Sequence, residues 1–93
     1  MYYHILKQVR ENIRNNNYVM TLHAEEEMDN DNLTIFDIEG VILTGKIIER
    51  QRDHKTSEWK YLIEGLSLDN ITAVVVAKMS PTNTLVIITV YRI

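Results

Sequence analysis

Cysteine is absent from this chain of 93 residues, and proline and glycine are scarce. Without cysteine there are no disulfides, no thiolate metal site, no iron–sulfur cluster and no cysteine nucleophile. Gly40, Gly45 and Gly65 stand apart from one another, which excludes a glycine-rich phosphate loop. No segment approaches the ~18 apolar residues of a membrane helix, and the first residues do not resemble a signal peptide. We therefore expect a cytoplasmic protein that has no membrane partner.

Positive charge is also in the minority, with 10 lysines and arginines against 13 acids and a net charge of −3. This sign is unfavourable for a domain that binds nucleic acid through its overall charge. The excess of acids lies in residues 1–45, which hold three bases and eight acids, whereas residues 46–93 hold seven bases and five acids. A basic surface on the second half is compatible with these numbers.

The length and the 45% content of hydrophobic residues predict one globular domain that spans residues 1–93. A chain of this size buries only about 60 to 65% of the surface that its unfolded form exposes. It therefore gains stability from self-association.

The first half of the chain carries helical periodicity. Apolar residues recur at three- and four-residue spacing over residues 3–16, with asparagines at the end, which predicts an amphipathic helix. Thr21 is placed to cap a second helix at about residues 22–29. Thr34 and Asp37 resemble a capping box for a third helix that ends near residue 44, with Gly45 as a left-handed C-cap. Between the first two helices, residues 18–20 form a short extended segment.

The second half reads as strands. We expect four of them, at residues 46–52, 59–64, 71–79 and 84–92, joined by short loops as an antiparallel meander. In the last two strands the side chains on both faces are apolar, which is typical of strands that are covered on both faces. We expect Val75 and Ile88 in the core. The predicted fold is α+β, with three helices packed on a curled four-stranded sheet. Since three helices hardly cover two faces, we expect a homodimer through the last two strands.

Few residues carry a chemical signal. His23 and Glu27 have the i, i+4 spacing of a metal pair, but no third ligand completes a motif, so we expect no metal and no cofactor. Glu26 could serve as a general base, although acids in a first helical turn are also stabilised by the helix dipole. The hairpin of residues 46–61 interleaves basic residues with Trp59 and Tyr61, a pattern of single-stranded RNA binding and equally of a solvated hairpin.

Several short motifs resemble one bacterial family, domain of unknown function 4258, over about residues 20–92. They are His-Ala-Glu-Glu-Glu-Met at residues 23–28, Leu-Thr at 33–34, Asp-Ile at 37–38, Ile42, Gly-Lys-Ile-Ile-Glu at 45–49, Tyr61, Gly65, and Leu-Val-Ile-Ile-Thr-Val-Tyr at 85–91. The resemblance implies a fold like that of the small RelE and BrnT toxins, which are ribonucleases of toxin–antitoxin pairs.

The sequence departs from the family pattern at two positions. Members of the family usually carry arginines where this chain has Glu27 and Asp31. Exchanging two cations for two anions removes groups that would hold an RNA phosphate and stabilise its transition state. The resemblance leaves a candidate catalytic set in which His23 or Glu26 takes a proton, Arg50 and Lys60 neutralise the phosphate, and Tyr91 orients it: His23, Glu26, Arg50, Lys60, Tyr91.

Three functions follow from these observations. The first is a small, toxin-like interaction module, or one half of a toxin–antitoxin-type pair with a cognate protein partner, for which RNA is at most a weak ligand. The second is a weak, metal-independent endoribonuclease, which requires the five candidate residues around one cleft. The third is a structural homodimer without a ligand.

Overall fold

The computed structural model describes residues 2–93, and these form three helices and five strands. Along the chain, a helix, a strand and two helices come first, and four strands follow. The elements are α1 (Tyr3–Arg14), β1 (Tyr18–Met20), α2 (Leu22–Asn30), α3 (Ile35–Thr44), β2 (Lys46–Arg52), β3 (Trp59–Leu66), β4 (Thr72–Met79) and β5 (Leu85–Arg92). The α+β class and the three N-terminal helices are confirmed.

The sheet has five strands in the order β1-β5-β4-β3-β2. The predicted sheet of four antiparallel strands is therefore wrong, because it lacks one strand. Strands β2 to β5 form the expected antiparallel meander. The extra strand is β1, the short extended segment, which pairs in parallel with β5. Backbone bonds from Leu85 to Asn17 and from Thr21 to Ile87 continue this ladder at both ends. A three-residue strand gives no periodicity of its own, so only its partner reveals it.

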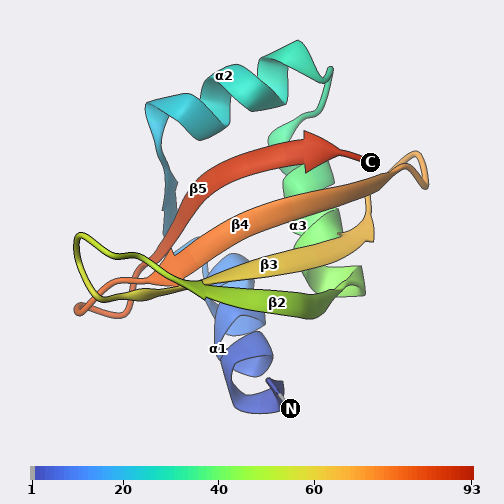
Figure 1. Ribbon diagram of the computed structural model, residues 1–93. Coiled ribbons are helices and arrows are strands. Elements are labelled where there is room, and N and C mark those ends of the chain that lie inside the picture. The colour runs from blue at the N-terminus through green and yellow to red at the C-terminus, as the bar shows by residue number, and fades with distance from the viewer. Residues whose placement is uncertain (1) are drawn as a thin grey trace.

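The helices are distributed unevenly around the sheet. Figure 1 shows α1 and α3 behind the sheet, while α2 runs above β5 and the near face of the sheet is crossed by none of the three. The core lies between the sheet and the two helices behind it, and α2 adds the buried Ala24 beside β5. It is centred on fully buried aliphatic side chains of α3 and of the three middle strands, among them Ile38, Ile42, Ile63, Val75 and Ile87.

The helix ends follow the expected chemistry, with one exception. The Thr21 hydroxyl accepts the amide of Ala24 at 3.1 Å, and Thr34 and Asp37 form a complete capping box at the start of α3. The expected left-handed C-cap at Gly45 is wrong, because its φ of −90° and ψ of −173° are extended. Glycine is needed here for space: a Cβ would collide with the carbonyl oxygen of Glu64, where the end of α3 touches β3.

Of the two core residues expected on the last strands, Val75 is fully buried and Ile88 is only half-buried. A β-bulge explains the difference. Thr89 pairs with Val76 and Ile87 pairs with Ala77, so Ile88 is an extra residue without a partner across the strands. The bulge leaves Ile87 and Val90 in the core.

The face of the sheet opposite α1 and α3 is also apolar. Val74 and Val76, at 1% and 6% exposure, are buried within the single chain. In the register, Val74 lies between Glu64 and Tyr91, and Val76 lies between Leu62 and Thr89. Around this centre Leu62, Val86 and Ile88 remain half-exposed.

Candidate functional site

The five sequence-predicted site residues are divided between the two faces of the sheet and helix α2. Arg50 pairs with Tyr61, and the next residue of β2, Gln51, pairs with Lys60. Successive residues of a strand point to opposite faces. Arg50 therefore lies on the same face as the buried Tyr61, and Lys60 lies on the other face.

The remaining three residues lie on the side of β5. His23 and Glu26 are exposed on α2, which packs along β5, and Tyr91 is exposed near the end of β5. Arg50 is on β2, three interstrand spacings from β5, or roughly 14 Å. The cavity that Arg50 lines contains none of the other four candidates. The single cleft that the nuclease requires is not formed by these five side chains.

The two acids that replace the family's arginines also lie near β5. Asp31, at the end of α2, accepts the backbone amide of Arg92 through Oδ2 at 3.1 Å, and its carbonyl oxygen accepts the Arg92 guanidinium at 3.4 Å. Asp31 thus fastens α2 to the end of β5. Glu27 is half-buried on the same helix.

Arg50 belongs instead to a cluster of arginines and aromatic rings. Its guanidinium carbon lies 4.1 Å from the ring centre of Trp59 and 5.8 Å from that of Tyr2. The guanidinium carbon of Arg52 lies 5.1 Å from the same Trp59 ring. The rings of Tyr2 and Tyr61 meet edge to face at 6.2 Å. We call these five side chains the Arg50 cluster: Tyr2, Arg50, Arg52, Trp59, Tyr61.

Local structure explains why these residues meet. Arg52 pairs with Trp59 and Arg50 with Tyr61 across the β2–β3 hairpin, so all four side chains share one face. Tyr2 joins them because the start of α1 passes over that face. Contacts between an arginine and an aromatic face contribute about 0.5 to 2 kcal/mol, depending on exposure. The hairpin thereby holds two guanidinium groups in place.

The arginines of the Arg50 cluster form no ion pair within residues 2–93. Across residues 2–93 the one ion pair joins Lys78 to Glu58 at 3.4 Å, and neither arginine of the cluster takes part in it. Cavities flank the cluster on two sides. One is lined by His4 and Ile5 together with Arg50, Tyr2 and Tyr61, and the other reaches from Trp59 and Tyr61 to Pro81. The arrangement presents fixed cations beside aromatic surface.

This chemistry suits recognition of an anion. A guanidinium donates two parallel hydrogen bonds to a carboxylate or a phosphate, and the stacked aromatic side chain keeps its plane fixed. Among the described residues, histidines and acids nowhere gather in threes as a metal ion would need. The sequence pattern identified the hairpin residues of the cluster. It missed Tyr2, because only the packing of α1 brings residue 2 to residue 50.

Comparison with known proteins identifies one family. The model of the family described as Domain of unknown function (DUF4258) matches residues 20–92, which confirms the resemblance seen in the sequence. No curated protein and no solved structure matches the chain, so the likeness to the RelE and BrnT toxins stays a prediction. None of the helices in residues 2–93 is long and apolar enough to cross a membrane. α1 and most of β1 lie before the matched residues.

Proposed function

Because the chain belongs to the DUF4258 family, whose description names no activity, we propose its function from the site itself: it is an interaction module that binds an acidic partner protein through the Arg50 cluster. With that partner it forms one half of a pair of the toxin–antitoxin type. The observation that carries the proposal is the pair of guanidiniums over Trp59, neither of which is in an ion pair within residues 2–93.

The composition of the cluster fits a protein interface. Tryptophan, tyrosine and arginine are the residue types that dominate binding energy at such interfaces. Trp59 is 36% exposed, and a partner covering it would remove water from the neighbouring guanidiniums. Carboxylates of the partner would then form charge-assisted hydrogen bonds to Arg50 and Arg52.

RNA is the less favoured ligand for the same surface. Single-stranded RNA binds by stacking bases on free aromatic faces, but the Trp59 ring already carries two guanidiniums. The net charge of −3 also opposes a polyanion. A protein segment with a few carboxylates meets neither obstacle.

Intrinsic fluorescence tests the proposal directly, because Trp59 is the single tryptophan of the chain. The probe is a synthetic peptide of alternating glutamate and leucine, titrated at physiological salt. We expect a saturable change in Trp59 emission and a weakening of about tenfold in Arg50→Ala, which corresponds to roughly 1.4 kcal/mol.

The matched control is Lys55→Ala, which removes a cation from the exposed turn of the same hairpin and should bind as the wild type does. Equal binding by Arg50→Ala and Lys55→Ala would refute the proposal. Tighter binding of an oligouridylate than of the peptide would replace the protein partner by RNA.

A second candidate function rests on the other face of the sheet. Leu62, Val86 and Ile88 remain half-exposed around the buried Val74 and Val76, and none of the described helices crosses this face in Figure 1. We propose that two copies of the chain associate through it as a homodimer. This use of the sheet is compatible with a partner at the Arg50 cluster, because Arg50 lies on the opposite face.

A further inference from the structure

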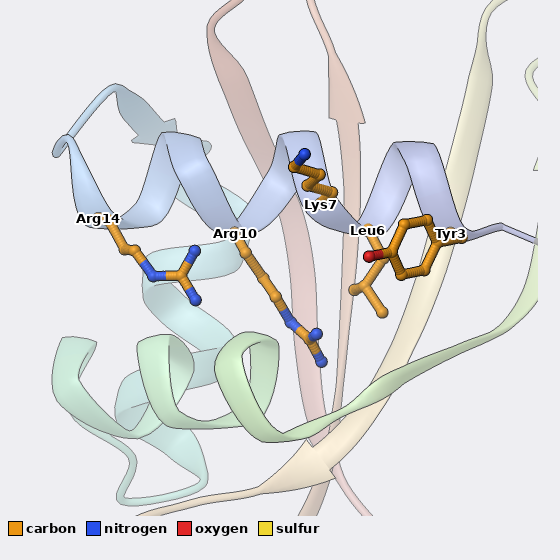
Figure 2. A pocket seen from close by; sticks show the side chains of 5 residues that line it. All are labelled: Tyr3, Leu6, Lys7, Arg10 and Arg14. Carbon is orange, nitrogen blue, oxygen red and sulfur yellow. The ribbon is translucent and has the colours of Figure 1, made fainter.

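A second groove runs along a different side of α1 from the Arg50 cluster. Figure 2 shows Tyr3, Leu6, Lys7, Arg10 and Arg14 along one side of this helix. Their spacing of three and four residues places them in one row. The row lines a cavity of about 170 Å³.

This cavity continues onto the sheet. Tyr3 and Leu6 also line a neighbouring cavity of about 510 Å³, which ends at β2. The two cavities therefore form one groove, in which an apolar floor is bordered by basic side chains. We call it the α1 groove. Its basic and aliphatic side chains include Leu6, Lys7, Arg10, Arg14, Lys46 and Ile48.

Arg10 is fixed by the structure. Its Nε donates to the carbonyl oxygen of Ile42 at 3.2 Å, and its Nη2 donates to the carbonyl oxygen of Gly45 at 2.6 Å. These carbonyls end α3, where the helix dipole favours a cation. One edge of the guanidinium is thus used within the chain, and Nη1 remains for an acceptor in the groove.

The charge of the groove is of one sign. Four cations border it, and the described residues that line it include no acid. Lys7, Arg10 and Arg14 are all the bases among the first 45 residues, a segment that also carries eight acids. None of them is in the ion pair that the structure contains within residues 2–93.

We propose that the α1 groove binds an acidic amphipathic segment of a partner protein. The cations would meet its carboxylates, and the exposed Ile48 (45%) and half-buried Leu6 would meet its apolar side chains. The twelve residues of α1 extend over about 18 Å, enough for roughly three turns of a partner helix. The proposal rests on the proposed function in requiring a protein partner. The α1 groove adjoins the Arg50 cluster at Tyr2, but the two sites share no charged residue.

Most of the α1 groove lies outside the part of the chain that the family model matches. All of α1 lies before residues 20–92, the part that the family model matches, and only Lys46, Ile47 and Ile48 come from within it.

The test uses a labelled fourteen-residue peptide in which leucine recurs every three or four positions and glutamate occupies the others, with binding followed by fluorescence anisotropy. Arg14→Glu and Lys7→Glu should each weaken binding by about tenfold, because each turns attraction into repulsion at the rim. The charge-matched control is Lys55→Glu, which should bind within about twofold of the wild type. Equal weakening by all three variants would overturn the proposal, since it would reflect net charge alone.

A second pair of variants tests the apolar floor. Ile48→Ser should weaken binding severalfold, whereas Leu68→Ser should not, although Leu68 in the β3–β4 turn is the more exposed of the two aliphatic side chains, at 66% against 45%. A peptide with serine in place of leucine should also bind more weakly. Identical affinity of the two peptides would overturn the amphipathic partner.

The outcomes separate the two sites. If Arg14→Glu weakens peptide binding and Arg50→Ala does not, the peptide contacts the α1 groove and not the Arg50 cluster. The reverse pattern removes the groove and keeps the cluster. Tighter binding of an oligouridylate than of the peptide would assign the α1 groove to RNA and overturn the proposal. A dimer that Arg14→Glu converts to a monomer, as measured by sedimentation, would assign the groove to a second copy of the chain and would also overturn it.

Discussion

Single residues join the helices to the sheet. The Asp37 carboxylate accepts the amide of Thr34 at 2.8 Å within the capping box, and its other oxygen accepts the amide of Leu68 at 3.1 Å. Likewise the Tyr18 hydroxyl donates to Glu39 at 2.7 Å and links β1 to α3. Burial and this acceptor raise the pKa of Tyr18 to about 12, so the phenol stays protonated as a donor.

The stability of the fold should depend on pH through Asp37. The bond from the Thr34 amide is the main cause that holds the pKa of Asp37 below its ordinary value of 3.8. Stabilisation by the charged carboxylate is therefore complete above that value and is lost as the pH falls through the lower folded-state pKa. We expect the free energy of unfolding to decrease below about pH 4 more steeply in the wild type than in Asp37→Asn, as measured by urea denaturation. Parallel curves for the two proteins would contradict this role.

Two glycines allow α3 to touch the sheet. A Cβ on Gly65 would meet the carbonyl oxygen of Val41 and lie 2.8 Å from the Cα of Gly45, both of them backbone atoms that cannot move aside. We expect Gly65→Ala to cost at least ~3 kcal/mol, at the upper end of overpacked cores. Thermal or chemical unfolding measures the loss.

Gly40→Ala is the matched control for this substitution. Gly40 lies inside α3, and its Cβ would lie 3.2 Å from the carbonyl oxygen of Leu66. The gain of up to about 1 kcal/mol in helix propensity offsets this tight contact. A loss in Gly40→Ala as large as that in Gly65→Ala would show that the close approach at Gly65 is not the cause.

Among the elements, β5 has two features that shape the fold: its pairing on both sides and its bulge. It pairs with β1 on one side and with β4 on the other, and its bulge changes which side chains enter the core. A periodic sequence such as Leu-Val-Ile-Ile-Thr-Val does not show where the alternation is interrupted. The bulge therefore corrects the sequence-based prediction for Ile88 without changing the strand itself.

The bulge predicts unequal effects of neighbouring isoleucines. Ile87→Ala removes a fully buried side chain and should cost about 2 to 5 kcal/mol. Ile88→Ala removes a half-exposed one and should cost clearly less, about 1 kcal/mol. Guanidinium denaturation of the two variants provides the comparison. If Ile88→Ala were the more damaging, the bulge would be placed wrongly.

At the scale of the whole molecule, the two faces of the sheet differ in what they offer. One face supports α1 and α3 and presents the Arg50 cluster at the β2 edge, and the other face carries aliphatic side chains without a helix. The candidate catalytic residues are divided between them. A binding function needs only one of these surfaces, whereas the nuclease needs residues from both.

We expect the purified protein not to cleave RNA beyond a trace level when a chelator is present. Loss of one preorganised transition-state contact costs about 10² to 10³ in rate, and here Arg50 lies far from His23, with acids at positions 27 and 31. Incubation with long mixed RNA and gel analysis measures the activity. Cleavage that both His23→Ala and Arg50→Ala abolish would restore the ribonuclease hypothesis.

The homodimer predicts a doubled mass in light scattering at high micromolar concentration. Its interface should bury at least ~1,200 Å² in total and include Ile88 and Leu62. Leu62→Glu places a charge on the helix-free face and should give a monomer that remains folded, since Leu62 is only half-buried. A monomeric wild type would refute the dimer, and a dimer unaffected by Leu62→Glu would move it to another surface.

The sequence by itself determined the elements of this protein. Helical spacing, the Thr21 and Thr34 caps and the alternating apolar strands are local signals, and each predicted its element within a few residues. The short motifs of residues 20–92 also identified the family. The separate roles of Arg50 and Lys60 could not be found in the same way, because their faces depend on the hairpin register with its bulge at Ile48.

Tertiary structure alone decided the rest. The parallel pairing of β1, the close approach of Gly45 to β3 and the meeting of Tyr2 with Arg50 all join residues more than fifteen positions apart. Such contacts form because packing the whole chain buries the most apolar surface, and no local pattern records that choice. For the same reason, the basic residues of α1 appeared in the sequence as the outer face of an amphipathic helix, and only the neighbouring α3 and β2 made that face into a groove.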